Sequence, residues 1–172
     1  MQREGSRCGN CLAITFAVFG LMATVFATTS VQGQQADPTA AGLRAWRLAG
    51  CASCHGTFGE GGGGGEQPEG PNLRRTSLDS AAIRETVRCG RPGSKMPFFL
   101  KGAYTATSCW NTPVQEEAPA EVTGLGSLSA DAIDALVAYL GARVIGKSDT
   151  ITKAECAAYF GNATHPTCAA LD

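Results

Sequence analysis

The chain has 172 residues, of which 44% are hydrophobic and 17% are charged, and its formal net charge is -1. This near-neutral balance excludes a nucleic-acid binder that works through overall positive charge. The eight cysteines are too many for an ordinary cytosolic protein of this size, in which thiols are few and stay reduced.

The first 33 residues have the pattern of a signal peptide. Two arginines precede an uncharged, apolar run from Leu12 to Ala27, which is 16 residues long. A membrane-spanning helix needs about 20 residues, so this run suits the hydrophobic region of a signal peptide better. Small residues follow it, and they allow a cut before Gln34 or one after Ala27. The alternative is an uncleaved membrane anchor. We expect an exported, periplasmic protein with no membrane span once the signal is removed.

Export changes what the cysteines can do, because an oxidising compartment lets disulfides persist. Cleavage before Gln34 removes Cys8 and Cys11 with the presequence. Six cysteines then remain in the mature protein: Cys51, Cys54, Cys89, Cys109, Cys156 and Cys168.

A predicted helix over residues 38–49 leads into the sequence Cys-Ala-Ser-Cys-His, residues 51–55, which is the attachment signature for c-type haem. The two thiols, three residues apart, lie on one side of a helical turn and can add to both vinyl groups of one porphyrin. A zinc site would need a second pair of ligands, and a thioredoxin-like dithiol expects strand–helix–strand flanks. The sequence therefore predicts that Cys51, Cys54 and His55 hold one covalent haem c, with His55 on the iron.

The mature chain offers few candidates for the other axial position of the iron. Met96 is its one methionine, and His165 is its one histidine besides His55. A lone methionine is usually a core residue, but a haem iron needs a second ligand, and a thioether is one that c-type cytochromes use. We expect Met96 to be that ligand, with His165 or an open position as the alternatives.

The rest of the chain predicts further helices separated by irregular segments. Hydrophobic periodicity and end signals indicate helices over residues 77–89, 129–140 and 152–160. Residues 59–66 contain five consecutive glycines, and we expect a mobile surface loop there. Residues 101–127 are rich in Pro, Gly and Glu, which is typical of an irregular connection.

These features resemble the class I, mitochondrial-type, small monohaem cytochromes c of exported bacterial type. Gly42 and Trp46 stand where the family lets its first helix cross its last one closely, with Leu136 and Tyr139 as packing partners. The segment Gly-Pro-Asn-Leu at residues 70–73 is similar to the family's Gly-Pro-x-Leu. The resemblance implies an all-α cytochrome c fold wrapped around one covalently attached haem, in which the carbonyl of Pro71 accepts a hydrogen bond from the ligand histidine.

The resemblance ends near residue 145, so we expect a cytochrome c domain over residues 34–146 and a disulfide-containing C-terminal extension over residues 147–172, with the core folding without that extension. Four cysteines outside the haem motif allow three pairings. We predict Cys89–Cys109, which would enclose Met96, and Cys156–Cys168, which would close a loop within the extension.

Basic residues are concentrated between Arg74 and Lys101, and Arg84 and Arg88 share one face of the helix predicted there. Two interpretations stay open. The residues could form a docking face that steers an acidic redox partner, or they could be a solvated helix face with one or two arginines on the haem propionates.

The resemblance implies an electron carrier and not an enzyme. Its partners would be redox proteins, with a dehydrogenase as donor and an oxidase or another cytochrome as acceptor, and without nucleic acid. One alternative is the haem c subunit of a dehydrogenase complex, such as a quinoprotein alcohol dehydrogenase or a sulfur-compound dehydrogenase. The other is a ligand-binding haem sensor or peroxidase with a displaceable Met96.

Overall fold

A computed structural model describes residues 38–63 and 66–171, which belong to one compact unit. The predicted signal peptide lies outside the described residues. The described elements follow in the order α1 (Pro38–Leu48), α2 (Ala52–His55), a 3-10 turn η1 (Leu73–Arg75), α3 (Ser80–Cys89), β1 (Phe98–Leu100), β2 (Gly124–Leu128), α4 (Ala130–Arg143), α5 (Lys153–Phe160) and α6 (Pro166–Ala169). The four longer helices lie where the sequence predicts them, within a few residues at each end.

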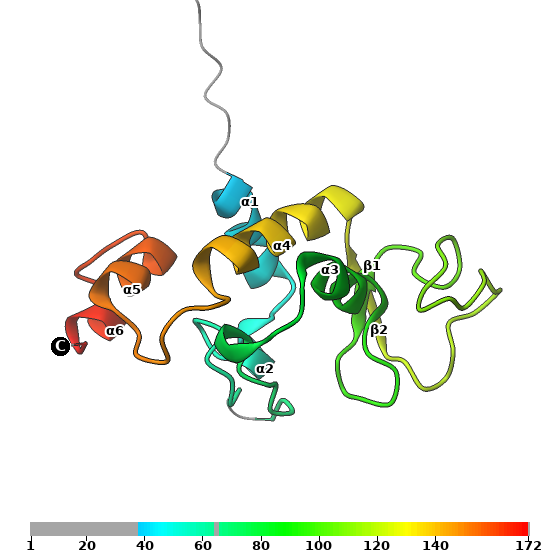
Figure 1. The fold of residues 1–172 in the computed structure, drawn as a ribbon, viewed down its shortest axis with the longest axis horizontal. Coiled ribbons are helices and arrows are strands. Elements are labelled where there is room, and N and C mark those ends of the chain that lie inside the picture. Colours follow the sequence, from blue (N-terminus) through cyan, green and yellow to red (C-terminus); the bar gives the residue numbers. More distant parts are fainter. Residues whose placement is uncertain (1–37, 64–65, 172) are drawn as a thin grey trace, which may run out of the picture. The chain divides into compact units, whose positions relative to one another are not determined.

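The centre of the fold is the crossing of α1 and α4 (Figure 1). The two backbones meet at Gly42, where a Cβ atom would lie 2.1 Å from the carbonyl oxygen of Ala135 and 2.4 Å from the Cβ of Tyr139. Only a residue without a side chain allows this approach. Around the crossing lies the main hydrophobic core, whose most deeply buried members include Trp46, Ile133, Leu136 and Val144.

The fold is mainly helical, but the expectation of an all-α fold is wrong at one place. β1 and β2 form a two-stranded parallel sheet beside α3, with Phe98 opposite Gly124 and Leu100 opposite Leu128. The strands are only three and five residues long, too short for an alternating pattern to reveal them. Residues 101–123 connect them as an irregular loop, which we call the insert.

The C-terminal extension packs against the preceding part of the chain. Phe58, in the turn that follows His55, lies in a second hydrophobic cluster with the Cys156–Cys168 disulfide. Next to this cluster, Arg74 is only 2% exposed. Its guanidinium donates to the carbonyl oxygens of Phe58 (3.3 Å) and Ser148 (2.5 Å), and it pairs with the Glu155 carboxylate at 2.8 Å.

The first prediction concerns the helix crossing. Gly42→Ala should lower the free energy of unfolding by about 1–3 kcal/mol, because the added methyl group forces two closely packed helices apart. Gly141→Ala is the matched control, since nothing lies within 4 Å of the added methyl group in α4, and it should be neutral or slightly stabilising. Denaturant unfolding of the two variants measures the difference. Equal stability of both would contradict the close approach.

The second prediction concerns the ion pair between Arg74 and Glu155. Burial raises the pKa of Glu155, but hydrogen bonds from Thr152 and Arg74 outweigh it and lower the pKa below the usual 4.5. Ionised Glu155 therefore stabilises the fold above pH 4.5, and this contribution is lost as the pH falls through the lowered pKa.

Glu155→Gln should accordingly cost about 2 kcal/mol at neutral pH, the scale of a hydrogen bond to a charged group. The free energy of unfolding of this variant should also fall less than that of the wild type between neutral pH and about pH 3. Asp149→Asn is the control, because Asp149 pairs with Arg75 on the surface, where ion pairs contribute little. Unfolding curves across this pH range that coincide for wild type and Glu155→Gln would refute the role of the pair.

Candidate haem site

The residues of the attachment motif form a single helical turn at the end of α1. The backbone N–H of Cys51 donates to the carbonyl oxygen of Trp46, and that of His55 donates to Cys51 (3.0 Å). Cys51 and Cys54 are both free and half-buried. Burial raises the pKa of the Cys51 thiol to about 12, so this thiol is protonated in the protein as described.

The imidazole of His55 is held in one tautomer. Its Nδ1 lies 3.0 Å from the carbonyl oxygen of Pro71, and a carbonyl only accepts, so Nδ1 carries the proton. His55 is 7% exposed. Burial lowers the pKa of His55, while the hydrogen bond to Pro71 raises it in part, so the neutral form is favoured. The result is an oriented, neutral imidazole whose Nε2 lone pair is available to a metal.

Glycines shape the other side of this turn. The backbone N–H groups of Gly63 and Gly70 both donate to the carbonyl oxygen of Cys54, at 2.8 and 2.7 Å. A Cβ atom at Gly70 would lie 2.7 Å from Nδ1 of His55. Gly63, in the described part of the glycine-rich segment, therefore packs against the motif, and mobility of that segment stays a prediction. Residues 64 and 65 lie outside the described residues.

Met96 lies on a different segment, residues 90–98, between α3 and β1, which we call the ligand loop. Its side chain is half-buried and packs on the main core, as does that of Cys51. Within the loop, the N–H of Arg91 donates to the carbonyl oxygen of Met96 at 3.1 Å. The Cys89–Cys109 disulfide joins the last residue of α3, directly before this segment, to the insert, and Cys156–Cys168 joins α5 to α6. These are the two pairings that the sequence predicts.

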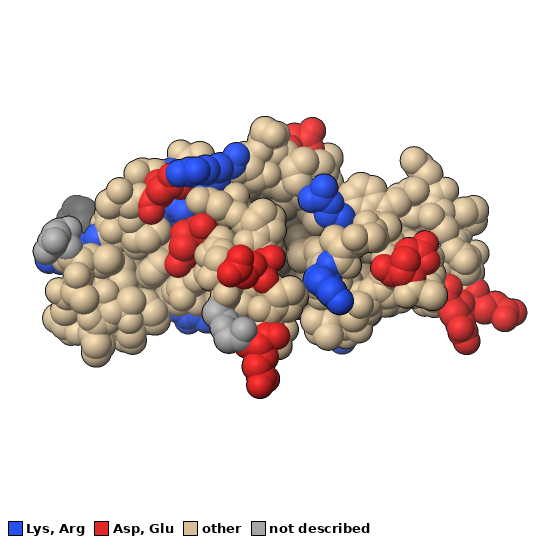
Figure 2. Space-filling model, turned by 90° about the horizontal axis from the view of Figure 1, so that it is seen from below, with Lys and Arg blue, Asp and Glu red and all other residues tan. Residues whose placement is uncertain are grey.

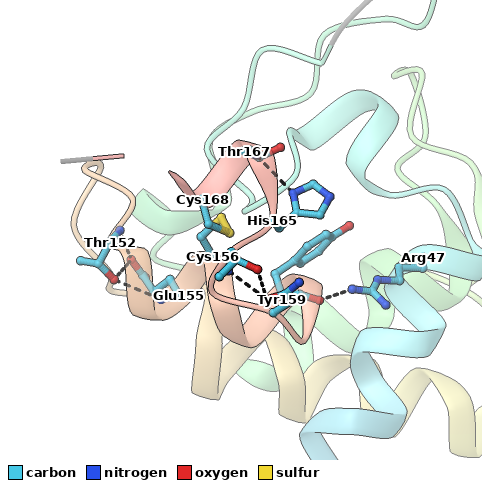
Figure 3. Close-up of a disulfide and its surroundings, with 10 residues drawn as sticks. Arg47, Thr152, Glu155, Cys156, Tyr159, His165, Thr167 and Cys168 are labelled. Atoms are coloured by element: carbon cyan, nitrogen blue, oxygen red, sulfur yellow. Dashed lines mark hydrogen bonds between the residues drawn. A yellow bond between two sulfur atoms is a disulfide. The ribbon is translucent and has the colours of Figure 1, made fainter. Parts of the chain in front are cut away.

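His165, the other ligand candidate, lies in the C-terminal extension (Figure 3). Its ring stacks on that of Phe160 with the centroids 3.7 Å apart, and its Nδ1 accepts a hydrogen bond from the N–H of Thr167 at the start of α6. One ring nitrogen is thus engaged in capping a helix. The imidazole belongs to the cluster around Cys156 and Cys168, and no described contact links it to His55.

The basic residues of segment 74–101 divide into two groups. Four arginines are in ion pairs: Arg74 with Glu155, Arg75 with Asp149, Arg84 with Asp134, and Arg88 with Glu85. Arg91, Lys95 and Lys101 have no ion-pair partner among the residues that the structure describes. Figure 2 shows basic and acidic side chains interspersed on the face in view. The ion pairs of Arg84 and Arg88 favour the interpretation as a solvated helix face over that as a docking face.

Residues 37–111 match the family model described as cytochrome c oxidase, cbb3-type, subunit III. The matched segment is a c-type cytochrome domain. It contains the attachment motif, the Pro71 carbonyl and the ligand loop. Comparison with curated proteins and with solved structures gives no significant match. A c-type cytochrome domain holds its haem covalently, so the cofactor of this domain is haem c.

The residues present fit that cofactor. Two free thiols stand one helical turn apart, and an oriented, neutral imidazole follows them directly. Trp46, whose ring centroid lies 6.4 Å from that of His55, has a buried Nε1 donor without a hydrogen-bond partner in the described part of the chain. The sequence indicated Arg74 only as one member of a basic stretch and gave no role to Tyr104 or Trp110, although the position of Trp110 beside Cys109 was an available signal. Among the described residues, no helix is long and apolar enough to cross a membrane.

The third prediction concerns Gly70. In Gly70→Ala the new methyl group should displace the His55 ring from Pro71, because it would overlap with Nδ1. Loss of such a hydrogen-bond partner costs about tenfold or more in metal affinity. We therefore expect a severalfold smaller fraction of haem-loaded protein, measured as haem absorbance per polypeptide. Gly141→Ala, in open space, should load normally. Normal loading and an unchanged reduction potential in Gly70→Ala would contradict the constraint.

Proposed function

We propose that this protein is an exported electron carrier in which Cys51 and Cys54 attach one haem c and His55 and Met96 are its axial ligands. The observation that carries the proposal is the hydrogen bond from Nδ1 of His55 to Pro71, directly beside two free thiols. It presents a neutral Nε2, as metal ligation requires. Haem c supplies one-electron redox chemistry when it is bound.

Met96 is favoured over His165 by the surroundings of each residue. Met96 packs on the same core as Cys51 and lies on a segment closed by a disulfide. His165 is used in the C-terminal extension, by its stacking on Phe160 and its cap on α6. A methionine and a histidine together raise the reduction potential of c-type haem. This suits a carrier that accepts electrons from a dehydrogenase and passes them to an oxidase or another cytochrome.

Export is supported by two features. The N-terminal sequence has the signal-peptide pattern, and the described chain contains two disulfides of the kind that persist in an oxidising compartment such as the periplasm. The cations of the ligand loop, Arg91 and Lys95, are exposed and offer an attraction for an acidic redox partner. The description of the family matched by residues 37–111 names an oxidase, which supports an oxidase as the acceptor in this proposal.

The fourth prediction tests the ligand set. The ferric protein should show the weak near-infrared band of sulfur-to-iron charge transfer. Met96→Ala should abolish this band and lower the reduction potential on the order of 0.1 V or more, since axial ligands tune haem potentials over about 0.8 V. His165→Ala is the control and should change neither quantity.

A Met96→Ala protein that keeps the band, or a His165→Ala protein that loses it, would reverse the assignment. Carbon monoxide separates the carrier from a ligand-binding sensor or peroxidase. The reduced wild type should not bind it at neutral pH, whereas Met96→Ala should.

A further inference from the structure

Two aromatic side chains of the insert hydrogen-bond to the end of α3, directly before the ligand loop. The hydroxyl of Tyr104 donates to the carbonyl oxygen of Cys89 at 2.9 Å, and Nε1 of Trp110 donates to the carbonyl oxygen of Gly90, also at 2.9 Å. The last carbonyls of a helix have no partner inside the helix and need one elsewhere. Here the insert supplies it from more than a dozen residues further along the chain.

The same insert also holds the other end of the ligand loop. The N–H of Phe98 donates to the carbonyl oxygen of Thr123 at 2.9 Å. The Phe98 ring packs edge-on against the Tyr104 ring, with the centroids 5.9 Å apart, and its far edge fills the space beside Gly124. Both ends of the loop therefore contact residues 104–124. Figure 1 shows α3, β1 and β2 as neighbours in the fold.

The ligand loop is closed on itself between these two ends. The N–H of Arg91 donates to the carbonyl oxygen of Met96, and the N–H of Met96 lies 3.2 Å from Oγ of Ser94. A shift at Cys89 or Gly90 is thus passed on to Met96 through one short ring of hydrogen bonds. The position of the thioether depends on where the end of α3 is held.

The backbone of the insert adopts an uncommon conformation at the two aromatic residues. Tyr104 and Trp110 have positive φ angles of 66° and 49°. Residues with side chains seldom adopt this conformation, and it persists where the surroundings enforce it. Tyr104 is 1% exposed, and the N–H of Trp110 donates to Glu85 at 2.9 Å. The insert is therefore anchored firmly enough to hold another segment.

We infer that Tyr104 and Trp110 are positioning residues for Met96: their hydrogen bonds to the Cys89 and Gly90 carbonyls fix the end of α3 and keep the ligand loop closed. The inference rests on the proposed function, in which Met96 is an axial ligand. The disulfide does a different task, because a cross-link restrains chiefly the unfolded chain. The two hydrogen bonds act on local opening of the folded loop.

The test uses the full-length, haem-loaded protein with Tyr104→Phe and Trp110→Phe, each of which removes a hydrogen-bond donor while keeping an aromatic ring. Tyr139→Phe is the matched control, since it deletes the same hydroxyl from a tyrosine that is 6% exposed in α4. Imidazole is titrated into the ferric protein, and displacement of Met96 is followed by loss of the near-infrared band. Hydrogen exchange of the Arg91 amide, which bonds to the Met96 carbonyl, is measured in parallel.

In Tyr104→Phe we expect the half-saturating imidazole concentration to fall about fivefold, the effect of one buried hydrogen bond on an opening equilibrium. The Arg91 amide should exchange faster by a similar factor, while amides of α4 stay unchanged. Trp110→Phe should shift both quantities in the same direction, and Tyr139→Phe should shift neither.

Unchanged imidazole affinity in both insert variants would overturn the inference. An equal shift in Tyr139→Phe would also overturn it, because the effect would then be one of global stability. A wild-type protein without the band would refute Met96 as the ligand and so the proposed function. Hydrogen exchange of the Arg91 amide then tests separately whether the insert keeps the ligand loop closed. Faster exchange in Tyr104→Phe would support this role of the insert, and an unchanged rate would refute it.

Discussion

The backbone contact between α1 and α4 at Gly42 positions α1 and the attachment turn that continues from it. Trp46 lies one turn further along α1, on the same face, and is buried against Tyr139. The N–H of Cys51 bonds back to Trp46, so the attachment turn continues directly from the crossing helix. The distance between α1 and α4 therefore sets where His55 stands relative to the core. A side chain at position 42 would move the cofactor site together with the helix.

A buried charge links this core to the C-terminal extension. An isolated guanidinium is costly to remove from water, and Arg74 meets that cost with two carbonyl oxygens and the Glu155 carboxylate. Two of these three acceptors belong to the extension. The extension thus supplies two of the hydrogen-bond acceptors of Arg74, which lies three residues after Pro71. It also packs against Phe58 in the turn after His55. Residues 147–172 therefore pack closely on the core, while folding of the core without them stays a prediction.

Local chemistry explains which features the sequence predicts. The motif at residues 51–55, the periodic helices and the capping box at Thr152 depend on neighbouring residues, and the structure places all of them as expected. The pairing of the four other cysteines also matches, because each disulfide closes a short loop. Burial of Arg74 was not predictable, since two of its three partners, Ser148 and Glu155, lie more than 70 residues away. The sheet was missed because its strands are short, and the hydrogen bonds of Tyr104 depend on backbone angles that no pattern of hydrophobic residues encodes.

The structure separates the basic residues of segment 74–101 into those that are paired and those that can attract a partner. Arg84 and Arg88, for which the sequence allows either a docking face or a solvated helix face, form ion pairs with Asp134 and Glu85. Arg91 and Lys95, two of the cations without a described ion-pair partner, lie on the ligand loop itself. An acidic partner attracted to them would pull on the segment that carries Met96, and any displacement there would disturb the proposed iron ligand. Because the insert holds both ends of that loop, it limits the displacement that a bound partner could cause. It lets the charged surface of the loop meet a partner while the carbonyls beneath it keep the thioether in place.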